Sequence, residues 1–363
     1  MSFQRAFNEA RAAGFGCAPN PRVGCVLLDS LGEPISQGHT QQAGCPHAEI
    51  MALRDAAARG NSVVGATAYV TLEPCSHHGR TGPCCDALIA AGISKVVVSI
   101  EDPNPLVSGQ GIARLRAAGI EVEIGPGAAE SRELNIGFFS RMIRKTPWVR
   151  MKIAASLDGT TALVNGQSQW ITSPEARTDG HAWRARACAV LTGIGTLLQD
   201  DPRLDVRLVE TPRQPYRIIV DTLLQTPPGA NIFEAGGAVW IYCATRDAAR
   251  EAALVAMGAT VSCLPDANGK VDLAAMMNDL ARREINELHI EAGSKLNGSL
   301  IRAGLVDEFL LYLAPKLLGP GSGMASFGPL QALSDALELQ FQSTDRVGAD
   351  LRIVARVAGR DQF

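Results

Sequence analysis

The sequence predicts two α/β domains in tandem, and three observations carry that expectation. The chain has 363 residues, which exceeds the usual size of one domain and is enough to bury two separate cores. Short apolar segments of strand character alternate with helical segments on either side of Thr146-Pro147. This pair ends a helical stretch before a new strand begins. We therefore expect a boundary near residue 146, with domains over residues 1–145 and 147–363.

The first domain begins with a predicted hairpin. Residues 23–28 form a short apolar run, residues 29–33 have the composition of a turn, and a second strand leads to His39. The elements that follow alternate in type: a helix over 48–59, a strand over 67–72, a helix over 85–91 and a strand over 95–100. This alternation predicts a sheet that is covered by helices.

The second domain repeats the alternation. A strand is expected over residues 148–153, directly after the break at Pro147. Further strands are expected near 189–192, 217–221, 238–243, 287–291 and 308–313. A helix is expected to start at Ser173-Pro174, because serine caps helix N-termini and proline is favoured at the first helical position.

Charge and cysteine content exclude several classes of protein. Lys and Arg total 34 against 37 Asp and Glu, a net charge of -3, so no overall positive field attracts nucleic acid or anionic lipid. Nine cysteines, an odd number, indicate free or metal-bound thiols in a reducing compartment. Neither an export signal nor a run of about 18 apolar residues is apparent. We expect a cytoplasmic protein that binds neither nucleic acid nor a membrane.

One histidine and two cysteines form the strongest motif of the first domain. His47 and Glu49 open a predicted helix, Cys75 follows a predicted strand, and a further cysteine is available at Cys84 or Cys85. One imidazole and two thiolates leave the fourth position of tetrahedral zinc open, as in catalytic rather than structural sites. Water in that position has its pKa lowered to about 7. Glu49 is then expected to carry protons and not to bind the metal.

Longer motifs resemble one known family over essentially the whole chain. In the first domain they are His47-Ala48-Glu49, residues 71–81, Cys84-Cys85 and Asp102-Pro103-Asn104-Pro105. In the second domain they are residues 152–159, 168–173, 200–202, 291–293 and 314–319. In this order they resemble the bifunctional deaminase/reductase family of riboflavin biosynthesis. The resemblance implies a cytidine-deaminase-like three-layer domain followed by a dihydrofolate-reductase-like α/β domain.

The resemblance also implies two consecutive reactions on a phosphorylated pyrimidine. The first is zinc-dependent hydrolytic deamination of 2,5-diamino-6-(5-phosphoribosylamino)pyrimidin-4(3H)-one to 5-amino-6-(5-phosphoribosylamino)uracil. The second is NADPH reduction of the ribosyl side chain to ribityl. The implied cofactors are one Zn²⁺ per chain and NADPH. Among the cysteines left open above, the family pattern selects Cys84 to join His47 and Cys75 as the zinc ligands.

Four residues of the first domain are implied to contact the substrate. His77 and Arg80 lie in the long loop between the two ligand cysteines and are expected on the phosphate, which suits their charge and donors. Arg80 and Gly82 stand where the family often has lysine and proline. Asn20 and His39 are implied as base and ribose contacts. Their alternative interpretation is that of turn residues with satisfied side chains.

A glycine-containing turn in the second domain is the predicted cofactor phosphate site. It follows a predicted strand and opens a helix, where backbone amides favour phosphate oxygens. Its residues are Gly293, Ser294, Lys295, Leu296, Asn297, Gly298 and Ser299. Residues 193–196 form a similar turn. No G-x-G-x-x-G motif with a suitably placed acidic residue is present, so a Rossmann domain is not expected.

The resemblance implies further contacts in the second domain. Those to NADPH are Ala154, Trp170, Thr196 and Asp200. Those to the substrate are Lys152, Ser168, Arg184, Leu204, Arg207 and Glu291. Arg184 lies among other charged residues of a predicted helix, so a solvated helix face is its alternative interpretation. Asp200 and Lys152 are both candidates for proton delivery, and the sequence does not decide between them.

Two other functions share part of this pattern. A nucleoside or tRNA deaminase with an unrelated second domain would use the same zinc chemistry, but the mixed charge argues against a polynucleotide substrate. A structural zinc module would close the metal with four ligands, whereas here three ligands accompany Glu49. We expect an enzyme that acts on a small molecule as a homo-oligomer.

Overall fold

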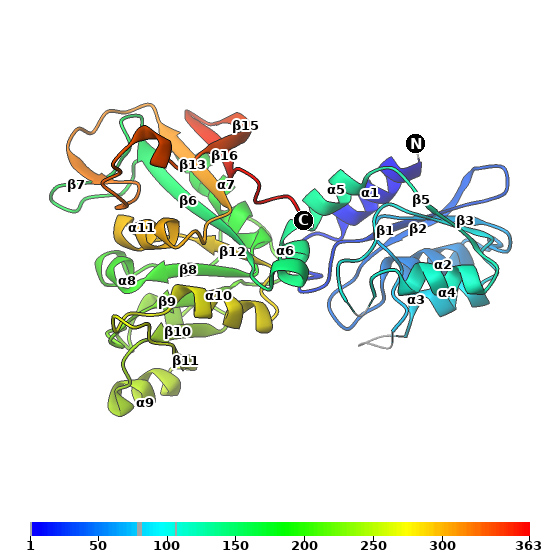
Figure 1. Cartoon of the computed structure of the whole chain (residues 1–363), viewed down its shortest axis with the longest axis horizontal. Coiled ribbons are helices and arrows are strands. Elements are labelled where there is room, and N and C mark those ends of the chain that lie inside the picture. Colours follow the sequence, from blue (N-terminus) through cyan, green and yellow to red (C-terminus); the bar gives the residue numbers. More distant parts are fainter. Residues whose placement is uncertain (1, 78–81, 106) are drawn as a thin grey trace. The chain divides into compact units, whose positions relative to one another are not determined.

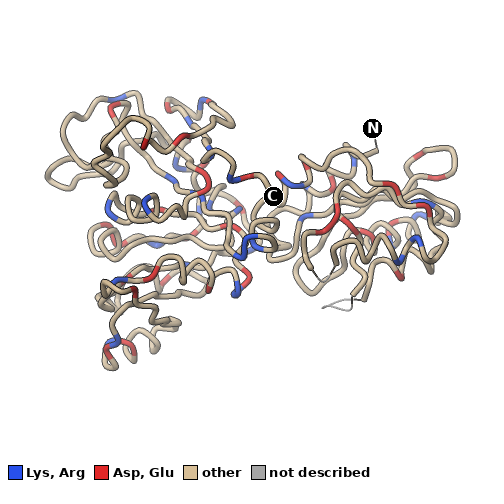
Figure 2. Tube along the Cα trace, in the orientation of Figure 1, with Lys and Arg blue, Asp and Glu red and all other residues tan. Residues whose placement is uncertain are grey.

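Two main sheets organise the chain, one in each of two units (Figure 1). The computed structural model describes residues 2–77, 82–105 and 107–363. The units are Met1–Arg144 and Lys145–Phe363, called unit 1 and unit 2 below. None of the described helices is both long enough and apolar enough to cross a membrane. Basic and acidic residues are interspersed along both units (Figure 2).

Unit 1 is a three-layer α/β unit, as expected from the resemblance. Its strands are β1 (Gly24–Leu28), β2 (Pro34–His39), β3 (Thr67–Val70), β4 (Lys95–Val98) and β5 (Glu121–Ile124). Its helices are α1 (Ser2–Ala12), α2 (Ala48–Ala58), α3 (Cys84–Ala90), α4 (Gln110–Ala117), α5 (Ala128–Leu134) and α6 (Ile136–Arg144). The strand order is β2-β1-β3-β4-β5, with β1 antiparallel to both neighbours and the other pairs parallel. Helices α1 and α5 cover one face of the sheet, and α2, α3 and α4 cover the other (Figure 1).

Two glycines let helices pack directly against the sheet of unit 1. A Cβ atom on Gly24 of β1 would lie 1.9 Å from the backbone oxygen of Ala6 in α1. A Cβ atom on Gly38 of β2 would lie 2.4 Å from the backbone nitrogen of Ala52 in α2. Any side chain at these positions would force the helices outward. The close contact at Gly38 therefore fixes α2, whose first turn carries Glu49, against the sheet.

Unit 2 is built on a nine-stranded sheet of order β11-β10-β9-β8-β12-β6-β13-β16-β15, with a separate pair β14-β7. Its strands are β6 (Trp148–Ser156), β7 (Thr160–Leu163), β8 (Ala189–Gly193), β9 (Tyr216–Val220), β10 (Val239–Cys243), β11 (Ala259–Cys263), β12 (Glu287–Ile290), β13 (Glu308–Ala314), β14 (Gly321–Gly323), β15 (Leu339–Val347) and β16 (Asp350–Val357). Its helices are α7 (Pro174–Arg186), α8 (Ile194–Asp200), η1 (Asn231–Phe233), α9 (Ala248–Ala256), α10 (Leu273–Arg282), α11 (Ser294–Arg302) and η2 (Leu333–Asp335). The strands from β11 to β13 are mutually parallel, and β16 and β15 continue the sheet antiparallel.

The register of the central strands brings two predicted site residues together. Strand β12 lies between β8 and β6, and Ile290 pairs with Met151. The next residue along each strand is Glu291 and Lys152, respectively, so these two are neighbours on adjacent strands. Because parallel α/β sheets bind ligands outside the carboxyl ends of their strands, this edge is the expected place for the site of unit 2.

Two of the predicted helix starts in unit 2, those of α7 and α11, are confirmed. Helix α7 begins at Pro174, where the Ser173 hydroxyl accepts a hydrogen bond from the backbone of Ala176 at 3.3 Å. Helix α11 begins at Ser294, directly after β12. Strand β15 was not predicted. Its residues are mostly exposed, and the apolar–polar alternation of residues 339–342 does not continue into the polar residues 343–346, so the strand pattern is short.

Candidate functional site

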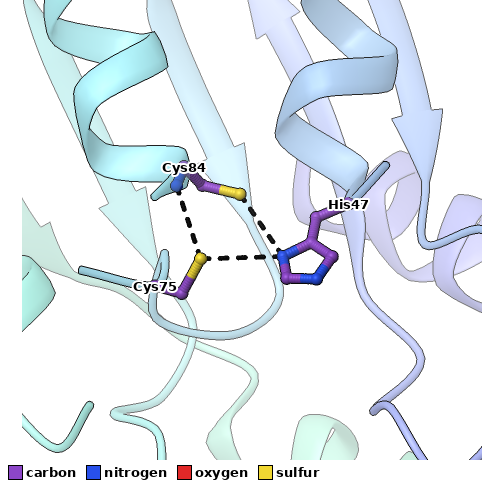
Figure 3. A group of neighbouring side chains, drawn as sticks. All are labelled: His47, Cys75 and Cys84. Carbon is purple, nitrogen blue, oxygen red and sulfur yellow. Dashed lines mark hydrogen bonds between the residues drawn. The ribbon is translucent and has the colours of Figure 1, made fainter. Parts of the chain in front are cut away.

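Three side chains of unit 1 converge on one point (Figure 3). His47 is the N-cap of α2, Cys75 lies in the loop after β3, and Cys84 is the first residue of α3. The Nδ1 atom of His47 lies 3.6 Å from Sγ of Cys75 and 3.4 Å from Sγ of Cys84. The three ligand atoms lie within 4.8 Å of one another. We call these residues the metal cluster.

The surroundings of Cys75 favour its thiolate form. The backbone N–H of Cys84 donates to Sγ of Cys75 at 3.3 Å. The pKa of Cys75 is lowered, chiefly by hydrogen bonding to Cys84 and against the opposing effect of burial. Thiolate is the form that binds zinc. An imidazole and two sulfur atoms at these separations fit a zinc ion that keeps a fourth position open.

Glu49 is the proton carrier that the sequence predicts for this site. It lies in the first turn of α2 and its side chain is buried. Burial raises its pKa to about 7, and the negative charge of Cys75 adds to the shift. A carboxyl group with such a pKa can both accept and donate a proton near neutral pH.

Cys85 faces away from the metal cluster. Its Sγ donates to the backbone oxygens of Pro74 at 3.2 Å and Gly111 at 3.5 Å. Burial raises its pKa to about 12, which favours the thiol form that these hydrogen bonds require. Of the two cysteines that the motif left open, Cys84 is the one beside His47.

Glu73 organises the backbone around Cys75, and the sequence reasoning assigned it no role. Its buried carboxylate accepts hydrogen bonds from four backbone N–H groups, at distances of 2.8 to 3.2 Å. The donors are Asp102, Gly109, Gly111 and Ile112. The last two open α4, so the carboxylate also complements that helix terminus. These bonds tie the loop before Cys75 to the segment from 102 to 112, and no local pattern in the sequence marks such backbone partners.

The predicted substrate contacts of unit 1 are residues outside the metal cluster. His39 ends β2, and its Nδ1 lies 2.9 Å from the Glu9 carboxylate. Asn20 donates its backbone N–H to Cys17 at 3.0 Å. In the described part of the chain, His77 has a buried Nδ1 without a hydrogen-bond partner. Arg80 lies outside the described residues.

Unit 2 contains a cavity of about 1180 Å³. The predicted residues that line it are Lys152, Ala154, Ser168, Trp170, Arg184, Thr196, Asp200, Leu204, Arg207, Glu291, Gly293, Ser294, Lys295, Leu296 and Asn297. Gly298 and Ser299 lie beyond the lining. A Cβ atom on Gly298 would lie 2.0 Å from the backbone oxygen of Ser326, and the Ser299 hydroxyl donates to the backbone of Lys295 at 3.1 Å.

Glu291 links the charged groups of this cavity. Arg184 donates to both of its carboxylate oxygens, and Nζ of Lys152 lies 3.7 Å from one of them. Burial raises the pKa of Glu291, but Arg184 and Lys152 outweigh this effect and hold it well below its usual range. Burial lowers the pKa of Lys152. Arg184 is thus part of a mostly buried ion-pair group and not of a solvated helix face.

The two predicted phosphate turns of unit 2 meet in the same cavity. Gly193 precedes α8, and a Cβ atom on it would lie 3.0 Å from the side chain of Leu296 in α11. Thr196 of α8 approaches Gly293, where an added Cβ atom would lie 3.5 Å from the threonine hydroxyl. Among the described residues no side chain caps the N-terminus of α11, so its backbone amides are available to an anion.

Comparisons with known proteins cover both units. A family model of the cytidine and deoxycytidylate deaminase zinc-binding region matches residues 2–100, and the RibD C-terminal domain matches residues 147–353. The riboflavin biosynthesis protein RibD of Escherichia coli K12 is 45% identical over 362 residues, which covers 96% of each chain.

Solved structures agree over the full length. Acinetobacter baumannii RibD (form 1) has a TM-score of 0.88 at 38% identity, covering 98% of this chain and 97% of that one. A diaminohydroxyphosphoribosylaminopyrimidine deaminase/5-amino-6-(5-phosphoribosylamino)uracil reductase from Thermotoga maritima has a TM-score of 0.87 at 31% identity, covering 98% of each chain. Together with the metal cluster and the cavity, these matches show that the chain belongs to the RibD family of bifunctional deaminase/reductases of riboflavin biosynthesis.

Proposed function

We propose that this chain deaminates 2,5-diamino-6-(5-phosphoribosylamino)pyrimidin-4(3H)-one and then reduces the ribosyl side chain of the product with NADPH. The observation that carries the proposal is the match, along the whole chain, to the Thermotoga maritima protein named for both activities. We assign the deamination to residues 1–145, which hold the metal cluster, and the reduction to residues 147–363, which hold the cavity.

In the deaminase part, His47, Cys75 and Cys84 would hold a zinc ion. The ion supplies Lewis-acid activation of water when bound. Glu49 accepts a proton from the attacking water and returns it to the departing amino group, which a pKa of about 7 allows in both directions. The amino substituent leaves as ammonia, and water supplies the oxygen of the new carbonyl group on the ring carbon.

In the reductase part, charged side chains orient the substrate against the hydride donor. Glu291, held by Arg184 and Lys152, faces the ribosyl hydroxyls as a hydrogen-bond acceptor. The N-terminus of α11 seats the cofactor phosphates. Two groups meet the requirement for a proton donor, because burial raises the pKa of Asp200 and lowers that of Lys152. NADPH, when bound, supplies the hydride.

We also propose that the protein acts as a homo-oligomer in the cytoplasm, on a phosphorylated pyrimidine and not on nucleic acid. The mixed distribution of charge in both units supports the small-molecule substrate (Figure 2). Light scattering on the purified full chain tests the oligomeric state, and a mass of one chain would overturn that part of the proposal.

The deciding experiment is an anaerobic assay of the zinc-loaded full chain with the diaminopyrimidinone ribosylamine phosphate. Ammonia release and NADPH absorbance are followed with and without the cofactor. We expect ammonia without NADPH, and NADPH oxidation only after deamination. Ammonia without NADPH oxidation would overturn the reductase assignment, and the absence of both signals would overturn the riboflavin assignment.

A further inference from the structure

The loop between β7 and α7 carries Trp170 into the cavity of unit 2 without a regular element to support it. Residues 164–173 belong to no helix or strand, and the structure describes all of them. Trp170 lines the cavity and is 61% exposed. An indole that is exposed to this extent gains little from packing, so its position depends on the polar contacts of its loop.

Three successive carbonyl oxygens of this loop accept hydrogen bonds from cationic side chains. Nζ of Lys316 donates to the oxygens of Trp170 at 3.4 Å and of Ile171 at 2.7 Å. Nη1 of Arg177 donates to the oxygen of Thr172 at 2.9 Å. Hydrogen bonds from charged donors are stronger than those from neutral ones, so these three fix the backbone at Trp170 and directly after it.

Arg177 also holds the indole ring itself. Its guanidinium carbon lies over the ring of Trp170, 4.5 Å from the centroid, which is the geometry of a cation–π contact. Arg177 lies in the first turn of α7, and the start of this helix is fixed by the cap at Ser173. The guanidinium thus covers one face of the indole and leaves the other face for a ligand in the cavity.

The backbone of Lys316 is held in turn by the connection between β6 and β7. The N–H of Leu157 donates to the backbone oxygen of Lys316 at 2.9 Å. The Asp158 carboxylate accepts the backbone N–H groups of Leu318 at 3.1 Å and Gly319 at 2.8 Å. Lys316 is not among the described residues that line the cavity, so it can act on a ligand there only through the loop that it binds.

We propose that Arg177 and Lys316 are positioning residues of the reductase, which hold the ring of Trp170 ready to stack on a flat ring of NADPH. The proposal rests on the proposed function above, which assigns NADPH to this cavity. An aromatic surface that is already in place lowers the cost of binding, because the ligand does not have to order the indole and its loop. Arg177 also lines the cavity, so the competing explanation is that its charge contacts the ligand directly.

NADPH binding to the full chain, measured by titration calorimetry, tests the proposal. Arg177→Gln and Lys316→Met should each weaken binding about fivefold, and Trp170→Ala about tenfold. KM for NADPH should rise by the same factors while kcat stays within about twofold of wild type, because the lost interaction is one of binding and not of the transition state. Arg177→Lys, which keeps the cation, should recover part of the loss.

Arg283→Gln is the matched control for the cation–π contact. The guanidinium of Arg283 lies over the ring of Trp240, 5.0 Å from the centroid, and neither residue is among the described residues that line the cavity. We expect this variant to bind NADPH as wild type does. A general effect of losing a stacked arginine would weaken binding in the control as well, and would overturn the proposal.

Double variants decide whether the two cations act through the indole. In a Trp170→Ala background, neither Arg177→Gln nor Lys316→Met should weaken NADPH binding further, because residues that act through one group are not additive. Hydrogen exchange gives a second measurement that needs no cofactor and no turnover. The backbone amides of residues 164–173 should exchange faster in both single variants than in wild type.

The outcomes separate this proposal from the proposed function. If Arg177→Gln weakens NADPH binding equally with and without Trp170, the guanidinium contacts the ligand directly and the proposal is wrong. Faster exchange of the loop with unchanged NADPH binding would show that the loop does not serve the cofactor, which also overturns the proposal. Absence of NADPH binding to the wild-type chain would overturn the proposed function, and this proposal with it.

Discussion

The metal cluster of unit 1 and the cavity of unit 2 hold their polar groups in different ways. In unit 1 the polar side chains are held by hydrogen bonds from the backbone. The N–H of Cys84 donates to Sγ of Cys75, and the Glu73 carboxylate accepts hydrogen bonds from four further N–H groups. In unit 2 carboxylates hold cations, with Glu291 on Arg184 and Asp205 on two arginines. A metal site needs ligand atoms at fixed distances. An anion site needs cationic side chains that keep some N–H donors available to the ligand. Substitutions in the metal cluster should therefore abolish zinc binding and deamination altogether. Substitutions in the cavity should instead lower the rate of reduction by degrees.

The largest effect is expected at the third zinc ligand. Cys84→Ser should remove zinc and all ammonia release, because a hydroxyl is a poor replacement for a thiolate ligand. Cys85→Ser should keep zinc, since Cys85 bonds to backbone oxygens instead. Zinc per chain is measured by atomic absorption after gel filtration, with Cys45→Ser at an exposed cysteine as the control. Zinc loss in Cys85→Ser with retention in Cys84→Ser would reverse the assignment.

The next effect is expected at the proton carrier. Glu49→Gln should lower deamination about a thousandfold, because an amide cannot transfer the proton. Zinc content should stay at the wild-type level, since Glu49 is outside the metal cluster. Glu33→Gln, at an exposed turn, is the control. Loss of zinc together with activity would leave the acid–base role unsupported and would place Glu49 among the groups that hold the metal.

A graded loss is expected in the cavity. Glu291→Gln should lower NADPH oxidation about a hundredfold, because Arg184 and Lys152 lose the charge that pairs with them. Ammonia release should be unchanged. Glu251→Gln is the matched control, because Glu251 pairs with Arg246 away from the cavity. Wild-type reduction by Glu291→Gln would mean that the carboxylate does not orient the substrate.

The smallest effect is a pH dependence of stability in unit 2. The charged groups around His181 are Arg184, Arg207, Glu291 and Asp205, and the pKa of His181 falls from its usual 6.5 to about 4 on folding, first because of burial. The unfolded chain therefore binds a proton here before the folded chain does. The contribution of His181 is complete above about pH 6.5 and is lost as the pH falls toward about 4, by up to about 3 kcal/mol.

Comparison of wild type with His181→Gln measures this contribution. Thermal unfolding is followed across that pH range, using the transition that NADPH shifts upward as the report on unit 2. We expect the variant to depend less on pH than wild type, because an amide does not titrate. Equal pH dependence of the two proteins would show that His181 is not the neutral, buried ring described above.

Much of the fold could be predicted from the sequence, because short segments contain the patterns that specify helix starts and hairpins. The confirmed helix start at Ser173-Pro174 needs only a capping hydroxyl and a proline, and the hairpin ending at His39 needs only two strands and a turn. Trp170, which the resemblance implies as an NADPH contact, lines the cavity with a largely exposed side chain, and its contact with NADPH stays a prediction. Glu73 escaped prediction because its partners are backbone N–H groups, which leave no mark in a sequence.

The sequence by itself determined which groups this protein has for chemistry: an imidazole, thiols and a carboxylate at short spacing, and a turn that opens a helix toward phosphate. Only the tertiary structure decided how they are used. Cys84 and Cys85 are adjacent on a helix and point about 100° apart, so the docking of α3 selects which one meets His47. The pairing of Lys152 with Glu291 likewise depends on strand register. Register and helix docking arise from packing the whole core, and no short segment contains that information.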